Sequence, residues 1–223
     1  SSASSADEKD DCYMPENYDH NYRGPVTLRN ALAQSINVPS VKTLYLAGIR
    51  DSLDLMKEMG ISSLNDPDRY GLTLVLGGGE VSLLELTSAY SVFANGGARN
   101  PPVGLLRVED KGGNALEQYR DDSKQVLDKN IALTISDILS DNRARAPAFG
   151  ENSPLYFPDR PVAAKTGTTN DYKDAWVVGY APNIAAGAWF GNNDNTPMEK
   201  MVAGFIVAPM WNEFLNEAFK DLP

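Results

Sequence analysis

Apolar residues up to about Asp141 recur every three or four positions, the spacing that places side chains on one face of an α-helix. The pattern predicts five helices here, near residues 28–34, 39–47, 52–59, 83–94 and 129–139. Thr27, Asp51 and Asp128 can cap three of them, because their side-chain oxygens can accept from free backbone N–H groups. The sequence S-L-L-E at residues 82–85 has the form of a capping box. This part of the chain is therefore expected to be mainly helical.

The pattern changes near Arg160. Three short apolar runs follow, at Val162–Thr169, Ala175–Tyr180 and Ile184–Gly191. Short turn-like segments separate them, and such connections favour antiparallel neighbours. An amphipathic helix is expected over residues 207–218, and a separate hairpin over residues 105–119. We therefore predict an α+β fold, in which three sequential antiparallel strands are covered on one face by the final helix.

One folded domain is expected over residues 13–223. Residues 1–12 are mostly small, polar and acidic, which is typical of a disordered tail or linker. The chain has 223 residues, enough to bury a core without disulfides or metals. Trp176, Trp189 and Trp211 are expected to pack the three strands against the final helix.

Composition and charge exclude several kinds of chemistry. The net charge is −10, so the field of the protein would repel a nucleic acid. Cys12 is the only cysteine and His20 the only histidine, so neither an internal disulfide nor a zinc site of the His/Cys type can form. No apolar run approaches the roughly 18 residues of a membrane span. We expect no cofactor, no metal, no nucleic-acid partner and no membrane contact by this part of the protein.

Two short motifs carry candidate chemistry. Ser35-Ile36-Asn37 falls in the tight link between two predicted helices, where such residues often only stabilise a turn. Lys165-Thr166-Gly167-Thr168 falls on the first predicted strand. Glycine inside a strand often marks the close approach of a ligand or another backbone. The alternative is an edge strand whose lysine reaches solvent.

The order of these motifs resembles the transpeptidase domain of penicillin-binding proteins, especially the bifunctional class A type. The segments that carry the resemblance follow the family's order: Y-R-G-P-V-T-L-R at 22–29, S-I-N-V-P at 35–39, L-G-G-G-E at 76–80, L-T-S-A-Y at 86–90, K-T-G-T-T-N at 165–170 and D-A-W at 174–176. The resemblance covers roughly Tyr13 to Phe219. It implies a serine β-lactamase/D,D-peptidase-like fold, with an antiparallel sheet flanked by helices and a helical subdomain.

One family motif is absent from this sequence. The nucleophile of the family is the serine of an S-x-x-K motif upstream of S-x-N, yet no lysine here has a serine three positions before it. The resemblance therefore implies that the attacking serine and the first strands of the sheet lie outside residues 1–223, in an upstream segment or a second chain. We expect the fold to be incomplete in this chain, with an unpaired edge at Ile184–Gly191. This chain alone is expected not to turn over substrate.

The resemblance implies catalytic roles for four residues. Ser35 would relay a proton to the departing amine, and Asn37 would bind the substrate's amide. Lys165 would hold positive charge near Ser35 and the substrate carboxylate. The backbone N–H of Thr168 would contribute to the oxyanion hole.

The same strand would also bind substrate. The hydroxyls of Thr166 and Thr168 would contact the substrate carboxylate, and Thr169 belongs to the same binding segment. Gly167 would leave room for a substrate strand to lie alongside. Because side chains alternate along a strand, Lys165 and Gly167 are expected on one face and the two threonines on the other.

The implied partners are peptidoglycan stem peptides and β-lactam antibiotics. The implied location is outside the cytoplasm, in the periplasm or on the outer face of the cytoplasmic membrane, with an anchor absent from these residues. A non-enzymatic β-lactam-sensing or scaffold domain of the same fold is the main alternative. A serine β-lactamase is a weaker one, because the segments at 22–29 and 86–90 suit class A transpeptidases better.

Overall fold

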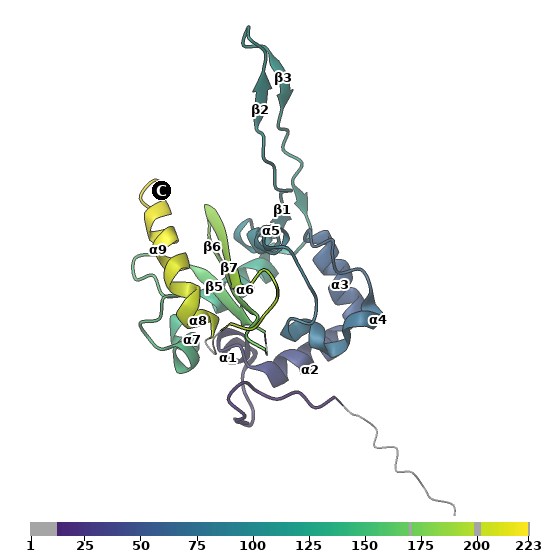
Figure 1. Ribbon diagram of the computed structural model, residues 1–223, viewed down its shortest axis with the longest axis vertical. Coiled ribbons are helices and arrows are strands. Elements are labelled where there is room, and N and C mark those ends of the chain that lie inside the picture. The colour runs from purple at the N-terminus through teal and green to yellow at the C-terminus, as the bar shows by residue number, and fades with distance from the viewer. Residues whose placement is uncertain (1–12, 170, 199–201, 223) are drawn as a thin grey trace, which may run out of the picture.

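The computed structural model describes residues 13–169, 171–198 and 202–222. The tail predicted for residues 1–12 lies outside these ranges. The helices are α1 (Leu28–Ala33), α2 (Asn37–Ala47), α3 (Ile49–Glu58), α4 (Pro67–Tyr70), the 3-10 helix η1 (Gly71–Leu76), α5 (Leu83–Ala94), α6 (Lys129–Ser140), α7 (Asn142–Phe149), α8 (Ala203–Ile206) and α9 (Ala208–Ala218). The strands are β1 (Ala98–Arg99), β2 (Arg107–Glu109), β3 (Ala115–Gln118), β4 (Lys124–Gln125), β5 (Ala163–Thr168), β6 (Asp174–Ala181) and β7 (Ile184–Gly191) (Figure 1).

A three-stranded antiparallel sheet in the order β5-β6-β7 confirms the three strands predicted from the apolar runs. Strand β6 lies in the middle, so β5 and β7 each keep one free edge among the described residues. The register places Lys165 opposite Val178 and Gly167 opposite Trp176. The K-T-G-T motif therefore lies along an edge strand.

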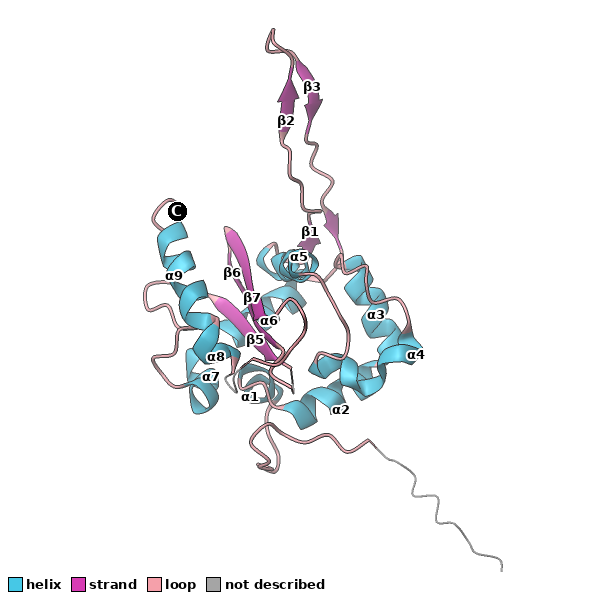
Figure 2. Cartoon of the chain, in the orientation of Figure 1, coloured by secondary structure: helices cyan, strands magenta, loops and turns pink. Residues whose placement is uncertain are grey.

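The two faces of this sheet pack against different helices (Figure 2). Helices α8 and α9 cover one face through a core that includes Val177, Trp211 and Leu215. On the other face Tyr180 packs against α6 and against aromatic residues of α5. The sheet is thus held between two apolar layers, which fixes the position of β5.

The three tryptophans do not share one role. Trp211 of α9 packs on the sheet as predicted. Trp176 and Trp189 instead lie opposite each other on β6 and β7, with ring centroids 6.4 Å apart. Ala175 and Val177 already face α8 and α9, so strand alternation turns Trp176 to the opposite face. The prediction was therefore wrong for Trp176 and Trp189.

The first part of the chain has its own core, built from residues of α2, α3, α4, η1 and α5, such as Leu44, Leu53 and Val92. The predicted hairpin is present as β2 and β3, which project away from the rest of the molecule (Figure 1). The four residues of β3 are all exposed. The hairpin therefore adds little to these cores.

Most of the predicted helix starts are confirmed. The side chains of Thr27, Asp128 and Ser82 each accept from a backbone N–H in the first turn of α1, α6 and α5. Glu85, which would complete the capping box, bonds Ser62 instead. Its carboxylate thus ties the start of α5 to the segment after α3.

Two features of the helical part differ from the prediction. Helix α3 starts at Ile49, directly after Gly48 with φ at 86°, so Asp51 lies inside the first turn and does not cap it. Helix α7 was not expected, since its sequence lacks a clear apolar repeat and contains Pro147. Asp141 caps this helix by accepting from Ala144 N.

Candidate functional site

The S-x-N motif forms a tight reversal between α1 and α2. Ser35 has φ at 58°, the left-handed region that non-glycine residues rarely adopt. Backbone bonds from Ser35 N to Leu32 O (3.2 Å) and from Ile36 N to Ala31 O (2.9 Å) end α1 just before it. The reversal allows α2 to begin at Asn37. We call Ser35–Asn37 the turn side of the site.

Lys165 on β5 connects this turn to the sheet. Its Nζ donates to Ser35 Oγ at 2.6 Å and to the backbone oxygen of Thr166 at 2.8 Å. Burial lowers the pKa of Lys165 to about 8, because the charged ammonium is poorly solvated there. The ammonium therefore stays mostly protonated at pH 7 but loses its charge more easily than an ordinary lysine. We call Lys165–Thr168 the strand side of the site.

Asn37 lies next to this pair but bonds to another segment. Its Nδ2 donates to the backbone oxygen of Glu16 at 3.0 Å. The structure therefore brings Ser35 and Lys165 into direct contact, and it places the Asn37 amide against the segment that precedes α1.

The hydroxyls of Thr168 and of the neighbouring Thr169 have different surroundings. Thr168 Oγ1 accepts from Ala203 N at 3.1 Å, at the start of α8. Thr169 Oγ1 accepts from the backbone N–H groups of Lys173 (3.0 Å) and Asp174 (2.9 Å), so it stabilises the turn between β5 and β6. A hydroxyl that accepts a bond keeps its own hydrogen for donation. Both threonines can therefore still donate to an anion.

Gly167 is exposed on the free edge of β5. A Cβ atom placed there would meet only Trp176 Cβ, at an ordinary distance of 3.5 Å. The packing of the described chain therefore does not require glycine at this position, and Gly167 leaves this part of the free edge without a side chain.

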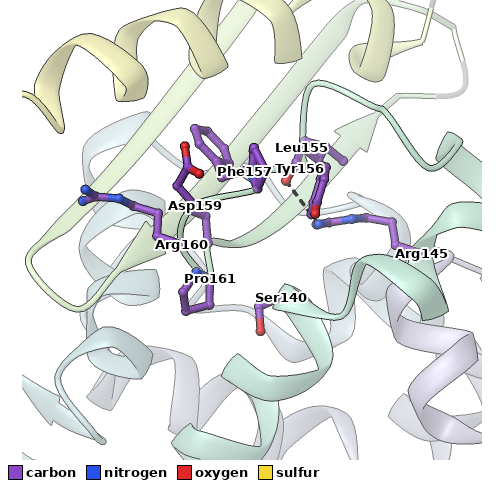
Figure 3. Close-up of a pocket in the computed structure, with 10 residues that line it drawn as sticks. Ser140, Arg145, Leu155, Tyr156, Phe157, Asp159, Arg160 and Pro161 are labelled. Carbon is purple, nitrogen blue, oxygen red and sulfur yellow. Dashed lines mark hydrogen bonds between the residues drawn. The ribbon is translucent and has the colours of Figure 1, made fainter.

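Two cavities lie away from the contact between Ser35 and Lys165. One, of about 250 Å³, is lined by Ser140, Arg145 and residues 155–162 (Figure 3). Another, of about 370 Å³, lies between the start of α3 and the segment around Pro67. Neither includes a residue of the turn side or the strand side. The candidate site is therefore defined by its polar contacts and by the open strand edge.

Arg145 and Asn17 are polar residues with buried side chains, and their burial was not predicted from the sequence. Arg145 is 3% exposed and donates to the backbone oxygens of Leu139 and Leu155, both at 3.1 Å. Burial lowers its pKa to about 10. It ties the end of α6 to the loop that leads into β5. No sequence signal distinguished these two residues from ordinary surface polar residues.

Residues 5–215 match the family described as the penicillin binding protein transpeptidase domain. Penicillin-binding protein 1A of Aquifex aeolicus is 36% identical over 217 residues, which cover 96% of this chain and 29% of that protein. Penicillin-binding protein 2D of Bacillus subtilis is 31% identical, over 97% of this chain and 31% of its own length. The chain thus spans about three tenths of the length of these relatives.

Solved structures share the same architecture. Penicillin-binding protein 1A from Haemophilus influenzae superimposes with a TM-score of 0.82 at 23% identity, over 95% of this chain and 37% of its own. The PonA1 protein from Mycobacterium tuberculosis in complex with penicillin V gives a TM-score of 0.79 at 22% identity, over 92% of this chain and 59% of its own. At this level of identity the likeness establishes the fold. It confirms the expected serine β-lactamase/D,D-peptidase-like class.

Proposed function

Because the chain belongs to the family of penicillin-binding protein transpeptidase domains, we propose that it forms part of a serine-type D,D-transpeptidase, which cross-links peptidoglycan stem peptides by acyl transfer. The observation that carries the proposal is the 2.6 Å bond from Lys165 Nζ to Ser35 Oγ, which joins two motifs 130 positions apart. Both groups lie beside the free edge of β5, where an extended peptide can pair.

The attacking serine comes from outside residues 1–223. Acyl transfer by this family needs a serine followed three positions later by a lysine, and the sequence contains no such pair. The free edge of β7 supports this part of the proposal. A long edge strand with unpaired backbone groups is normally covered or paired with another strand. An upstream segment of the same protein, or a second chain, would supply both the strand and the serine.

The turn side would handle the proton and the substrate amide. Ser35 Oγ already accepts from Lys165 Nζ, so its own hydrogen is free for donation to the departing amine. Asn37 would donate its amide to the acyl substituent once it is released from Glu16 O. The Lys165 ammonium would hold its positive charge beside Ser35 Oγ, which stabilises that oxygen as its proton leaves, and would attract the substrate carboxylate.

The strand side would orient the substrate. The free hydrogens of the Thr166 and Thr168 hydroxyls would bind the carboxylate, and Thr169 would extend this segment while it holds the turn. The backbone N–H of Thr168 would stabilise the oxyanion, a contribution of about 2.7–4 kcal/mol in comparable enzymes. Gly167 would allow the substrate backbone to approach β5 closely.

The same groups would bind β-lactams. These compounds carry a carboxylate and an acyl group in a similar arrangement to the peptide, so the threonine hydroxyls and Lys165 suit both. The complex of PonA1 with penicillin V supports this reading for a protein of the same fold. Stem peptides and β-lactams are therefore the ligands that we propose.

The proposed reaction also implies where in the cell the protein works. Peptidoglycan is assembled outside the cytoplasm, so the domain would work on the outer side of the cytoplasmic membrane, held there by a segment beyond residues 1–223. Among the helices that the structure describes, none is both long and apolar enough to cross a bilayer.

Labelling with a fluorescent penicillin tests the proposal. The full-length protein and residues 1–223 alone would be incubated with the compound and analysed after denaturation, which leaves only covalent label. We expect label on the full-length protein and none on residues 1–223. Addition of the segment that carries the S-x-x-K motif to residues 1–223 should restore labelling, and the label should then lie on the added segment.

Three results would contradict parts of the proposal. Stable labelling of residues 1–223 alone would show that the nucleophile lies within them. A full-length protein that is not labelled would remove the transpeptidase proposal. A full-length protein that is acylated but joins no peptides in a cross-linking assay would instead be a β-lactam sensor or scaffold.

A further inference from the structure

Helix α2 begins without a capping side chain at its own N-terminus. Its N-cap residue is Ile36, which makes no side-chain cap bond. The first N–H groups of an α-helix have no partner within the helix, and an unbonded one that is shielded from water costs free energy. Another part of the chain must therefore bond the start of α2.

Asn17 supplies that bond from 21 positions before Val38. Its Oδ1 accepts from Val38 N at 3.0 Å, and its Nδ2 donates to the backbone oxygen of Asn21 at 2.7 Å. The residue is only 6% exposed. Because both ends of the amide are bonded, the side chain has a single orientation and acts as an N-cap for α2.

The neighbouring residue holds the same turn at a second point. Glu16 O accepts from Asn37 Nδ2 at 3.0 Å, so Glu16 and Asn17 bond adjacent residues of α2. Figure 2 shows the loop before α1 passing beside the junction of α1 and α2. Two adjacent bonds fix both the distance and the rotation of the first turn of α2 relative to this loop.

Ser35 lies directly before this clamped turn. Its left-handed backbone, with φ at 58°, persists only where the surroundings hold it. The bond from Ser35 N to Leu32 O holds it on the α1 side, and the bond between Asn17 and Val38 holds it on the α2 side. Loss of the Asn17 bond would let the turn relax and would move Ser35 Oγ relative to Lys165 Nζ.

We infer that Asn17 is a positioning residue for the turn side of the site: its amide oxygen, bonded to Val38 N, holds the backbone of the turn so that Ser35 stays in the geometry that acyl transfer needs. The inference rests on the proposed function. Asn17 is expected to touch neither substrate nor the reacting atoms, so its whole effect passes through α2.

The test compares three variants with the wild type in the full-length protein. Asn17→Ala removes the acceptor for Val38 N. Asn17→Asp keeps that acceptor and adds a negative charge that a helix N-terminus favours, but it loses the donor to Asn21 O. Asn21→Ala is the matched control, because Asn21 contributes its backbone oxygen, which the substitution retains. The second-order rate constant of acylation by a fluorescent penicillin is measured well below the unfolding temperature of each variant.

We expect acylation by Asn17→Ala to slow about tenfold, the size of effect that loss of one cap and its geometry can produce. Asn17→Asp should be acylated at least about threefold faster than Asn17→Ala, because it keeps the bond to Val38 N although it loses the one to Asn21 O, and Asn21→Ala should match wild type. Recovery by Asp distinguishes positioning from a general loss of structure, because a merely destabilised protein would not regain rate from one oxygen.

A folded Asn17→Ala at the wild-type rate, or equal slowing by Ala and Asp, would overturn the inference. If Asn17→Ala does not fold, Asn17→Gln replaces it: its longer side chain misplaces the acceptor and should be slow where Asp is fast, and equal rates would overturn the inference. Failure of the wild type to be acylated would instead count against the proposed function.

Discussion

The two sides of the candidate site are held in different ways. The strand side belongs to a ladder in which β5 pairs with β6 from Ala163 to Thr168, and the sheet is packed by apolar layers on both faces. The turn side depends on single polar contacts from distant parts of the chain: Lys165 to Ser35, Asn37 to Glu16, and Val38 to Asn17.

This difference predicts different responses to substitution. A ladder with two packed faces distributes its stability over many contacts, so damage to the packing of the sheet that carries the strand side should appear mainly as lost stability. A turn held by single bonds can move without unfolding the protein, so damage on the turn side should appear mainly as lost activity. Lys165 belongs to both sides and should have the largest effect on activity.

We expect Lys165→Ala to slow acylation of the full-length protein by about 100-fold or more, which corresponds to about 2.7 kcal/mol. The substitution removes both the bond to Ser35 Oγ and the charge that we propose attracts the substrate carboxylate. The rate of labelling by a fluorescent penicillin measures the effect. Lys173→Ala, in the turn after β5, is the matched control and should stay near wild type. A Lys165→Ala rate within about threefold of wild type would show that the two sides act independently.

Two glycines of the sheet, Gly167 on the strand side and Gly179 on β6, separate stability from function. A Cβ atom at Gly179 would lie 2.4 Å from Ala163 O and 2.6 Å from Trp211 Cζ2, so Gly179→Ala should lower the free energy of unfolding by about 3 kcal/mol. At Gly167 the nearest atom is 3.5 Å away, so Gly167→Ala should stay within about 0.5 kcal/mol of wild type. Chemical denaturation measures both.

The two glycine variants also test the proposal that a substrate strand lies along β5. Gly167→Ala should still slow acylation, because its methyl group would stand where the substrate strand is proposed to approach β5. A Gly167→Ala protein with full stability and full activity would argue against substrate binding along this edge, and a stable Gly179→Ala protein would argue against the packing of α9 on the sheet.

The strand side was largely predictable from the sequence. Short apolar runs joined by short turns determine antiparallel strands, and alternation along β5 separates Lys165 from the threonines that flank Gly167. The faces of Trp176 and Trp189 were missed, because a tryptophan on a strand can pack against either layer. The alternation of residues along a strand predicts which side chains share a face of the sheet, but it does not predict which helix covers that face.

For the turn side, the sequence predicted only its place between two helices. The sequence places Ser35 between two helices, but neither its left-handed backbone nor the bonds to Glu16 and Asn17 have a local signature. A cap supplied from 21 positions away depends on how the chain returns in space. Arg145 was missed for the same reason, since its acceptors lie in other segments.

The pH dependence of acylation tests the charge on Lys165. The pKa of this group is lowered from 10.5 to about 8, so the ammonium is present below pH 8 and is lost above it. The second-order acylation rate should therefore fall as pH rises through about 8, approaching tenfold per pH unit. Lys165→Arg keeps its charge, so its rate, although lower overall, should show no fall near pH 8. A wild-type profile that is flat to pH 10 would contradict this role.

Stability should respond to the same titration in the opposite sense. Between pH 8 and 10.5 the unfolded chain binds this proton and the folded chain does not, so the free energy of unfolding should rise with pH. The rise should be absent in Lys165→Met. Measurements below pH 10 avoid the tyrosines Tyr90 and Tyr180, whose pKa burial raises to about 12.

The smallest expected effect separates strain from chemistry on the turn side. Ser35→Ala and Ser35→Gly both remove the hydroxyl, so both should slow acylation equally. Their stabilities should differ, because a left-handed backbone costs an L-residue about 1–2 kcal/mol, and the extra freedom of glycine in the unfolded chain offsets only part of that. We expect Ser35→Gly to be more stable than Ser35→Ala by about 1 kcal/mol in urea unfolding.

Ser40, one turn further along α2, provides the matched control for this comparison. Unlike the hydroxyl of Ser35, its hydroxyl makes no bond to Lys165 in the described part of the chain. It donates to Ile36 O at 2.8 Å, and its backbone is helical. There the order should reverse, with Ser40→Ala more stable than Ser40→Gly by about 1 kcal/mol. If alanine were the more stable substitution at both positions, the backbone at Ser35 would not be strained, and the turn would need no clamp from Asn17 to hold its shape.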